Sequence, residues 1–158
     1  MKMEELGKLF TSLGFENVLT VIASGNVIFQ TPEKDQVRLT QQIEKALLDS
    51  LGYEVKILLR NETHIHEMVK NDPFKGVTDK EIKFFVTFIA KGLDQDIKLP
   101  LKFNDEGSEI IKVTDGEVYF LRYPQGKTTE AMTFIDKMFG KYSTTRNWNT
   151  IQKIATLM

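Results

Sequence analysis

The chain has 158 residues, of which 41% are hydrophobic and 27% are charged, so it can bury a core without covalent cross-links. It contains no cysteine, which excludes disulfides, thiolate nucleophiles and zinc-thiolate sites and is typical of a reducing compartment. Its 21 basic and 22 acidic residues form no long block of one sign, so it lacks the footprint of a general nucleic-acid binder. No apolar run is long enough to cross a bilayer, and the sequence therefore predicts a cytoplasmic protein without a membrane span.

A helix and a hairpin are predicted first. Apolar residues recur at helical spacing from Met3 to Leu13, and Gly14 stands where a left-handed residue would end the helix. Two β-branched runs, 18–24 and 27–30, flank Gly25-Asn26, which favours a hairpin with a two-residue turn. The expected cross-strand pairs are Ile22 with Phe29 and Ala23 with Ile28.

A second helix and a third strand follow. Thr31 can cap a helix and Pro32 suits its first turn, and apolar spacing carries this helix to Gly52. The segment Tyr53–Arg60 then alternates between apolar and polar residues, which predicts a strand.

The second half begins with a short helix from Asn61 to about Lys70, which Asp72-Pro73 ends because the residue before proline avoids helical geometry. Ile82–Ala90 predicts a strand that is apolar on both faces and therefore covered on both. A polar stretch, 91–107, links it to the next elements.

A second hairpin and two helices complete the chain. Glu109–Val113 and Glu117–Tyr123 flank Asp115-Gly116, a pair typical of a tight turn. Thr128 or Thr129 is expected to cap a helix that ends at Gly140. The last helix is expected to begin within Thr144–Thr150 and to carry one apolar stripe, made of Trp148, Ile151, Ala155 and Met158.

This order predicts an α+β protein with two ferredoxin-like (split β-α-β) halves, residues 1–60 and 61–158, which have antiparallel sheets and pack as one compact unit. A split β-α-β half normally opens with a strand, whereas this chain opens with a helix. With its first strand missing, the first sheet would have an exposed edge that favours self-association.

Four motifs carry a family resemblance: Ser24-Gly25-Asn26-Val27-Ile28-Phe29, Asp72-Pro73-Phe74, Val118-Tyr119 with Tyr123-Pro124 and Gly126, and Thr144–Thr150. Together they resemble the bacterial family known as domain of unknown function 1697, over essentially the whole chain. The resemblance implies a cytoplasmic bacterial α+β protein with two ferredoxin-like halves and no established activity. Members usually begin with a strand and a glycine-rich turn of the type Leu-Leu-Arg-Gly-Ile-Asn-Val-Gly-Gly, which this chain lacks. They also tend to carry a serine and a lysine where this chain has Lys127-Thr128-Thr129-Glu130.

The start of the last helix is the best candidate site. A helix N-terminus offers unpaired N–H groups and a partial positive charge, to which a guanidinium and nearby hydroxyl and amide groups would add. We therefore predict a site for a small anionic ligand there, although a simple helix cap with a tryptophan anchor is the alternative. The expected contacts are Arg146, Asn147, Thr144 and Thr145, supported by Lys127 and Thr128 from the preceding helix start, with Ser24 and Asn26 as secondary contacts.

Other motifs do not indicate a cofactor or a metal. Gly126-Lys127-Thr128 is similar to the end of a phosphate-binding loop, but Leu121 stands where that motif needs a glycine. His64 and His66 would point about 200° apart on a helix, so they are read as surface residues that cannot share a metal. The acidic loop Asn104-Asp105-Glu106 is read as a solubility feature. The aromatic strand Lys83–Phe88 lacks the opening of an RNA-binding motif and is read as core.

The leading functional hypothesis is thus a binding module for a small anionic ligand. One alternative is an enzyme that acts on a phosphorylated or carboxylated substrate, although no general base or nucleophile can be assigned. Another is a structural or interaction protein that uses the open sheet edge.

Overall fold

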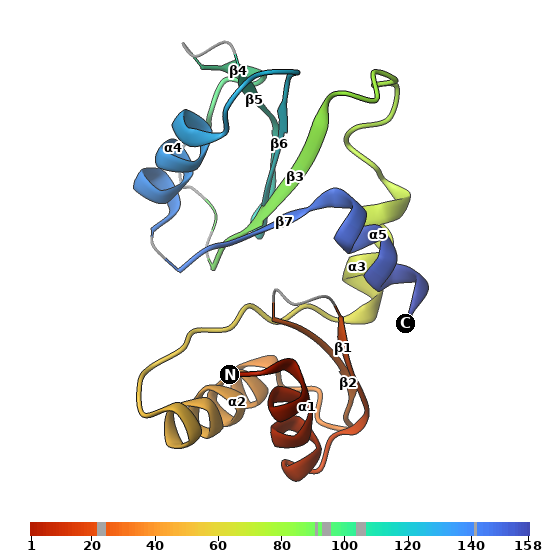
Figure 1. Ribbon diagram of the computed structural model, residues 1–158, viewed down its shortest axis with the longest axis vertical. Coiled ribbons are helices and arrows are strands. Elements are labelled where there is room, and N and C mark those ends of the chain that lie inside the picture. Colours follow the sequence, from red (N-terminus) through yellow and green to blue (C-terminus); the bar gives the residue numbers. More distant parts are fainter. Residues whose placement is uncertain (22–24, 91, 93–95, 104–106, 141) are drawn as a thin grey trace. The chain divides into compact units, whose positions relative to one another are not determined.

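The computed structural model describes residues 1–21, 25–90, 92, 96–103, 107–140 and 142–158 (Figure 1). The chain divides into two compact units: unit 1 contains Met1–Asn61 and Thr156–Met158, and unit 2 contains Glu62–Ala155. Helices and sheets are mixed and every described strand pair is antiparallel, which confirms the predicted α+β class. The parallel pair that a β-α-β crossover creates does not occur among these strand pairs. No helix in the described ranges is both long and apolar enough to span a membrane.

Unit 1 packs two helices and a hairpin around an aromatic and aliphatic core. Its elements are α1 (Met3–Ser12), β1 (Glu16–Val21), β2 (Asn26–Gln30) and α2 (Gln36–Leu51). Phe10, Phe15 and Ile43 are buried at the centre of the core. The rings of Phe15 and Phe29 stack with their centroids 4.5 Å apart, which joins the loop after α1 to β2. Both α1 and its predicted end before Gly14 are confirmed.

The first hairpin forms, but its predicted register was wrong. Val21 pairs with Asn26, and Ile28 pairs with Leu19 instead of Ala23. Asn26 is a strand residue whose amide Nδ2 donates to the Val21 carbonyl oxygen at 3.1 Å, so it closes the ladder and does not form a two-residue turn. The predicted partners Ile22 and Ala23 lie outside the described residues.

The predicted start of the second helix was also wrong. Asp35 is the N-cap of α2, and its Oδ1 accepts hydrogen bonds from the N–H groups of Val37 and Arg38 at 3.1 and 3.2 Å. A carboxylate that satisfies two free N–H groups is a strong helix start. Thr31 lies in a turn before the helix, where its Oγ1 accepts from the Glu33 N–H at 3.2 Å.

The segment 53–60 does not form the predicted strand. The alternation of apolar and polar residues does correspond to burial, because Val55, Ile57 and Leu59 pack against the core of unit 1. However, residues 53–60 belong to no strand ladder, and the Ile57 N–H donates to a side-chain oxygen of Glu44 in α2 at 3.4 Å. Alternation predicts which side chains face a core, but a strand also requires a paired neighbour.

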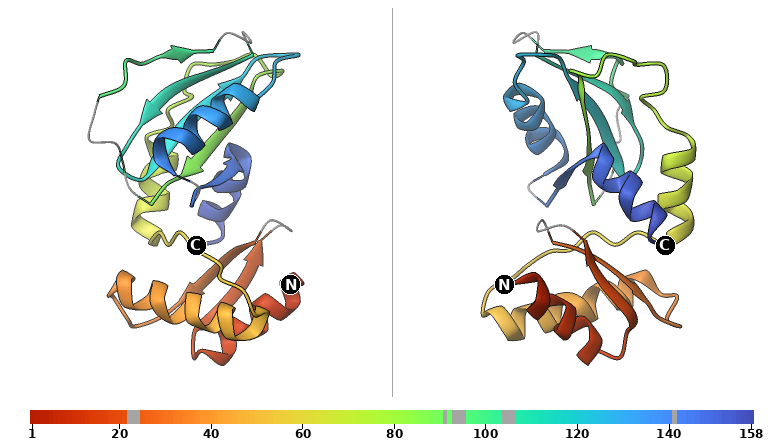
Figure 2. Two further views of the ribbon diagram at one scale, coloured as in Figure 1. Left: turned by 90° about the vertical axis from the view of Figure 1, so that its left-hand side faces the viewer. Right: turned by 45° about the vertical axis from the view of Figure 1, so that its right-hand side comes forward.

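Unit 2 is built on a five-stranded sheet with the order β4-β5-β6-β3-β7. Its elements are α3 (Glu62–Lys70), β3 (Lys83–Phe88), β4 (Leu101–Lys102), β5 (Ser108–Val113), β6 (Glu117–Arg122), α4 (Thr129–Phe139), β7 (Thr144–Asn147) and α5 (Trp148–Thr156). The predicted short helix, the strand after it, the second hairpin and the helix that ends at Gly140 are confirmed. The short strand β4 was not predicted. Figure 1 and Figure 2 show α4 on one side of the sheet and α3 with α5 on the other.

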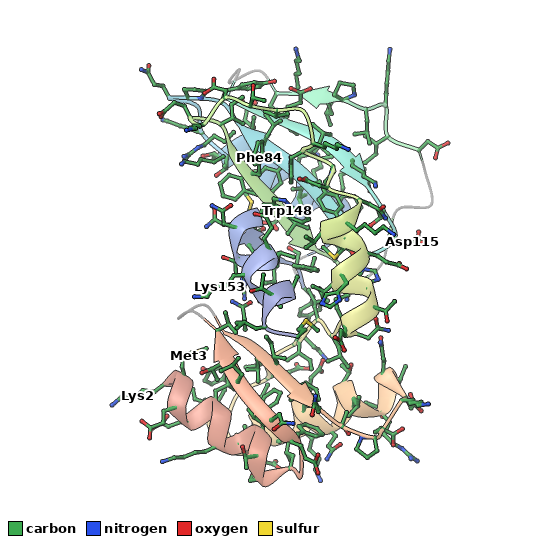
Figure 3. All side chains as sticks on the ribbon, turned by 90° about the vertical axis from the view of Figure 1, so that its right-hand side faces the viewer. Lys2, Met3, Phe84, Asp115, Trp148 and Lys153 are labelled. Carbon is green, nitrogen blue, oxygen red and sulfur yellow. The ribbon has the colours of Figure 1, made fainter. Side chains whose placement is uncertain are left out.

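Both faces of β3 are covered within unit 2. On the α4 face, Phe120 and Ile135 are fully buried in an aliphatic core. On the other face, Phe74 stacks on Phe84 with ring centroids 4.4 Å apart, and its edge meets Trp148 at 5.5 Å. Figure 3 shows Trp148 of α5 on this face beside Phe84. The expectation that this strand is covered on both faces is therefore confirmed.

The run Thr144–Asn147 was expected at a helix start, and it is a strand. It forms β7, which pairs along β3 from Phe88 opposite Thr144 to Phe85 opposite Asn147. The hydroxyls of Thr87 and Thr145 share a hydrogen bond of 2.7 Å, which pairs two polar side chains across the ladder. The last helix begins only at Trp148, which is 2% exposed and confirms its expected role as an anchor.

The cap of α2 gives a stability test. We expect Asp35→Ala to lower the free energy of unfolding by about 1 kcal/mol, because two backbone N–H groups lose their acceptor. Thr31→Ala is the matched control and should cost about 0.5 kcal/mol or less, since Thr31 does not cap the helix. Urea unfolding followed by far-ultraviolet circular dichroism measures both. A larger loss in Thr31→Ala would place the helix start where the sequence first suggested.

Candidate functional site

The sheet register separates the predicted anion-binding residues. Arg146 pairs with Val86, which in turn pairs with Tyr119, so Arg146 shares the sheet face that carries Trp148. Thr145 lies on the opposite face, where its Oγ1 is 3.6 Å from the sulfur of Met132 in α4. Thr144 is half-buried and Asn147 is exposed. The structure therefore places neighbouring residues of one motif on different faces.

Arg146 is the most distinctive charge of this motif. Its guanidinium is half-buried and donates through Nη1 to the carbonyl oxygen of Thr145 at 3.0 Å. Burial lowers the pKa of the Arg146 guanidinium from its usual value, because a charge removed from water is less stable. The first turn of α5 follows two residues later, so backbone N–H groups lie next to this cation along the chain.

Lys127 and Thr128 precede α4, on the other face of the sheet. Thr128 occupies the N-cap position of α4, but its side chain makes no capping hydrogen bond. The loop before it packs closely, because a Cβ added to Gly126 would lie 2.4 Å from the Cα of Gly107. Lys127 itself is exposed. A turn packed this closely leaves no room to wrap around a phosphate chain. This agrees with the sequence, where Leu121 stands at the position that a phosphate-binding loop needs as glycine.

The secondary candidates belong to unit 1. Ser24 lies outside the described residues. The side chain of Asn26 is used in the hairpin, where it donates to the Val21 carbonyl. The hydrogen bond to Val21 thus gives Asn26 a local structural role in the hairpin.

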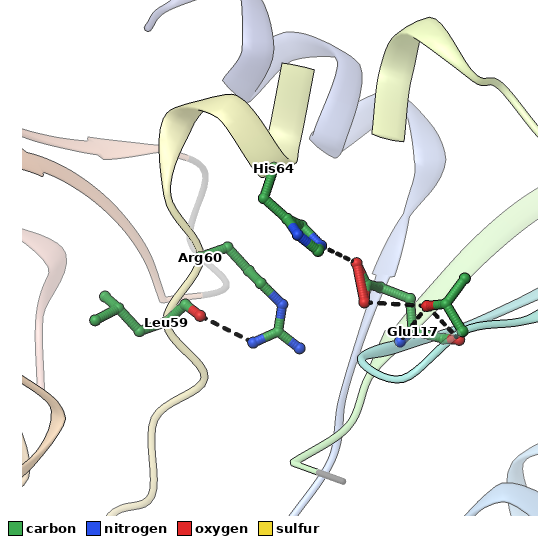
Figure 4. A network of polar contacts seen from close by, with 5 residues as sticks. Leu59, Arg60, His64 and Glu117 are labelled. Atoms are coloured by element: carbon green, nitrogen blue, oxygen red, sulfur yellow. Dashed lines mark hydrogen bonds and ion pairs between the residues drawn. The ribbon is translucent and has the colours of Figure 1, made fainter. Parts of the chain in front are cut away.

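The structure also assembles a site that the sequence did not indicate. A side-chain oxygen of Glu117 on β6 contacts Nε2 of His64 on α3 (Figure 4). The other oxygen of Glu117 is 3.3 Å from the hydroxyl of Thr114, and that hydroxyl also accepts from the Glu117 N–H at 3.0 Å. The His64 side chain is 44% exposed and that of Glu117 is 2% exposed, so a buried carboxylate supports a ring that solvent can reach.

Sequence reasoning missed this pair because its members are 53 residues apart and lie on different elements. The helix α3 buries Ile65 and Met68, and in this orientation His64 reaches Glu117 at the start of β6. His66 points elsewhere, and its Nε2 is 3.0 Å from the carbonyl oxygen of Ala155. Within the ranges that the structure describes, no three metal-binding side chains gather.

A second buried carboxylate lies at the opposite end of the β5–β6 hairpin. Glu109 is 7% exposed and accepts a hydrogen bond of 2.5 Å from the hydroxyl of Tyr123. This hydrogen bond raises the pKa of the Tyr123 hydroxyl above its usual value, because the carboxylate stabilises the protonated phenol. The contact joins the two strands just before the loop that leads to α4.

These features define an α+β protein with antiparallel sheets, a half-buried arginine on an edge strand and a histidine–carboxylate pair. The chain belongs to the family described as a protein of unknown function (DUF1697), whose model matches residues 1–119. This confirms the family that the sequence resembles. The matched residues include His64 and Glu117, whereas Thr144–Thr150 lies beyond them. No curated protein and no solved structure matches the chain.

The Tyr123–Glu109 contact predicts how stability depends on pH. Because the folded pKa of Tyr123 is raised, its contribution is complete below the unfolded tyrosine pKa of about 10 and is lost as pH rises through the folded value. Tyr123→Phe should lower the free energy of unfolding by about 1 kcal/mol at neutral pH and remove this part of the alkaline decline. Urea unfolding from neutral to alkaline pH measures it, with Tyr142→Phe at an exposed tyrosine as control. Parallel alkaline curves for wild type and Tyr123→Phe would contradict the assignment.

Proposed function

We propose that unit 2 binds a small anionic ligand at the junction of β7 and α5, with Arg146 as its central contact. The observation that supports the proposal is the half-buried guanidinium, whose pKa is lowered by desolvation. An anion next to a desolvated cation offsets the cost of removing that charge from water. A bidentate partner such as a phosphate or carboxylate matches the planar guanidinium best.

The site is smaller than the sequence suggested. The first N–H groups of α5, at Trp148 and Asn149, follow the strand directly and can add donors beside Arg146. Asn147 is exposed at the same junction and can contribute its amide. Lys127 and Thr128 are not part of the proposed site, because they precede a helix on the other face of the sheet. A cytoplasmic location belongs to the proposal and is supported by the absence of cysteine.

Anion binding can be tested with a matched pair of arginines. Inorganic phosphate, nucleotides and acidic metabolites are titrated against the wild type, Arg146→Ala and Arg122→Ala, and thermal unfolding and Trp148 fluorescence are recorded. Arg122 is also a half-buried strand residue, but it follows Phe120 on the α4 face, so it controls for general charge removal. A ligand at 100 times its Kd should stabilise the wild type and Arg122→Ala by roughly 2.7 kcal/mol and leave Arg146→Ala unchanged.

Three results would contradict the proposal. One is that no anion stabilises the wild type at concentrations that do not act as bulk salt. A second is that Arg146→Ala responds as strongly as Arg122→Ala, which would locate binding away from β7. Trp148, the single tryptophan of the chain, reports on the junction itself, so a stabilising anion that leaves its fluorescence unchanged points to a distant site.

A second candidate function is acid–base catalysis on a phosphorylated or carboxylated substrate. The specific observation is the contact of His64 with Glu117, because a buried carboxylate that orients a half-exposed imidazole is the arrangement of a general acid or base. Thr114 holds the second oxygen of Glu117 and so limits the rotation of that carboxylate. The same contact would attach α3 to the sheet in a protein without catalysis. An activity measurement therefore distinguishes the catalytic role from the structural one.

Acid–base catalysis is tested by substituting each of the two histidines of α3 in turn. Hydrolysis of p-nitrophenyl phosphate, acetyl phosphate and p-nitrophenyl acetate is measured for the wild type, His64→Gln and His66→Gln. Loss of a general acid or base should slow a genuine reaction by about a hundredfold or more in His64→Gln. His66→Gln should keep the wild-type rate, because Nε2 of His66 contacts the backbone carbonyl of Ala155. Equal rates in both variants would make the His64–Glu117 contact structural.

A further inference from the structure

Ser108 on β5 carries a buried polar group that the described part of unit 2 leaves without a partner. Its side chain is 1% exposed, and its hydroxyl makes no hydrogen bond to the described residues. Ser108 lies two residues before Ile110 and therefore shares the sheet face that α4 covers. A buried hydroxyl without a partner is unfavourable, so its presence in a folded protein requires an explanation.

The start of α4 lies beside this hydroxyl. The backbone of Gly107, the residue before Ser108, packs against the loop that leads into α4, because a Cβ added to Gly107 would lie 2.5 Å from the backbone nitrogen of Lys127. Thr128 at the N-cap position makes no side-chain capping hydrogen bond. The first N–H groups of a helix and its dipole favour a negative charge. An uncapped helix start and an unpaired hydroxyl thus meet at one end of the sheet.

Two cations face each other at the same end of the sheet. Arg122 on β6 pairs with Ser108 on one side and with Lys83 of β3 on the other, so neighbouring side chains of this row are about 5 Å apart on the α4 face. Like charges directly opposite each other are unfavourable. Among the described residues, Arg122 and Lys83 have no ion-pair partner, and the loop adds the exposed cation Lys127. Glu130 in the first turn of α4 supplies one opposing charge, so these cations still outnumber it.

We infer that the Ser108–Arg122–Lys83 row and the start of α4 bind an acidic peptide segment of a partner protein. One carboxylate of the segment would accept from the first N–H groups of α4, as a capping aspartate does. Ser108 would donate its hydroxyl to this carboxylate after the Arg122 side chain has turned toward the ligand. Further carboxylates would pair with Arg122 and Lys83 and so relieve the repulsion between these cations.

The chemistry of this patch favours carboxylates over a nucleic acid. The exposed aromatic side chains of the described residues, Tyr53 and Tyr142, lie outside β3, β6 and the loop before α4, so a base would find no ring to stack on. The patch lies on the face opposite Arg146, and the inference is independent of the proposed function. A single small anion would meet only part of the row, whereas neighbouring carboxylates would meet all of it, so the two sites take different ligands.

The test measures the binding of labelled peptides to the full chain by fluorescence anisotropy. One peptide alternates aspartate and serine and has both ends blocked, and the control peptide carries asparagine in place of each aspartate. We expect only the aspartate peptide to bind. Arg122→Ala and Lys83→Ala should each weaken its binding about tenfold, because each removes a charge-assisted hydrogen bond. Lys112→Ala, at an exposed lysine of β5 on the opposite face, is the matched control and should bind as the wild type does.

Ser108→Ala separates a role of the hydroxyl in binding from a role in folding. The substitution removes an unpaired buried hydroxyl, so urea unfolding should show that the free chain is at least as stable as the wild type. The aspartate peptide should bind about tenfold more weakly, because the carboxylate loses a donor. A less stable variant with unchanged affinity would contradict the inference, because the hydroxyl would then serve the fold alone.

Other outcomes would also overturn the inference. If neither peptide binds the wild type, or if both bind equally, the patch does not recognise carboxylates. Tighter binding of a labelled oligouridylate than of the aspartate peptide would assign the patch to a nucleic acid. Asp105 and Glu106 lie outside the described residues, and peptide binding that appears only in the double variant Asp105→Asn, Glu106→Gln would show that the chain's own carboxylates occupy the site. Arg146→Ala should bind the peptide as the wild type does, which separates this test from that of the proposed function.

Discussion

The double-sided burial of β3 is the constraint on which unit 2 depends. Val86 and Thr87 are fully buried, β6 and β7 occupy the two edges of the strand, and helices cover both of its faces. A buried hydroxyl requires a partner, and Thr145 supplies one to Thr87 across the ladder. The polar run Thr144–Asn147 therefore pairs with β3. This requirement places Arg146 on one defined face.

Local patterns predicted most of unit 2 and the ends of several helices. Helical spacing closed by Gly14, Gly52 or Gly140 marked helix ends, and each of these glycines has a positive φ. Asp115-Gly116 between two apolar runs likewise marked the β5–β6 hairpin, since a tight turn is set by adjacent residues. These features depend on neighbours in sequence, which is why the sequence alone was sufficient.

The predictions that were wrong depended on distant partners. Tyr53–Arg60 has the alternation of a strand but no neighbour to pair with, so periodicity overstated its structure. Thr144–Asn147 has no apolar alternation, yet it forms β7 because β3 offers a free edge. The start of α2 was wrong for a local reason, because the sequence favoured Thr31-Pro32 whereas the carboxylate of Asp35 accepts from two N–H groups and begins the helix. The pairing of His64 with Glu117 combines all these difficulties, because it needs the helix orientation and the strand register together.

The sheet register also decides how the two candidate functions relate to each other. Glu117 pairs with Phe88 and Arg146 pairs with Val86, so both side chains leave the sheet on the face opposite α4. Their backbones are two strand spacings apart across the sheet and two residues apart along it, which corresponds to about 12 Å. Val86 and Phe88 of β3 lie between them on that face and are buried, so the structure describes two separate groups of side chains and not one site. A ligand that bridged them would have to cross the buried strand β3, so anion binding and acid–base catalysis stand as two independent hypotheses. Under the first hypothesis the loss of Arg146 acts on binding alone, and under the second the loss of His64 acts on a chemical step alone, so neither substitution substitutes for the other as a test.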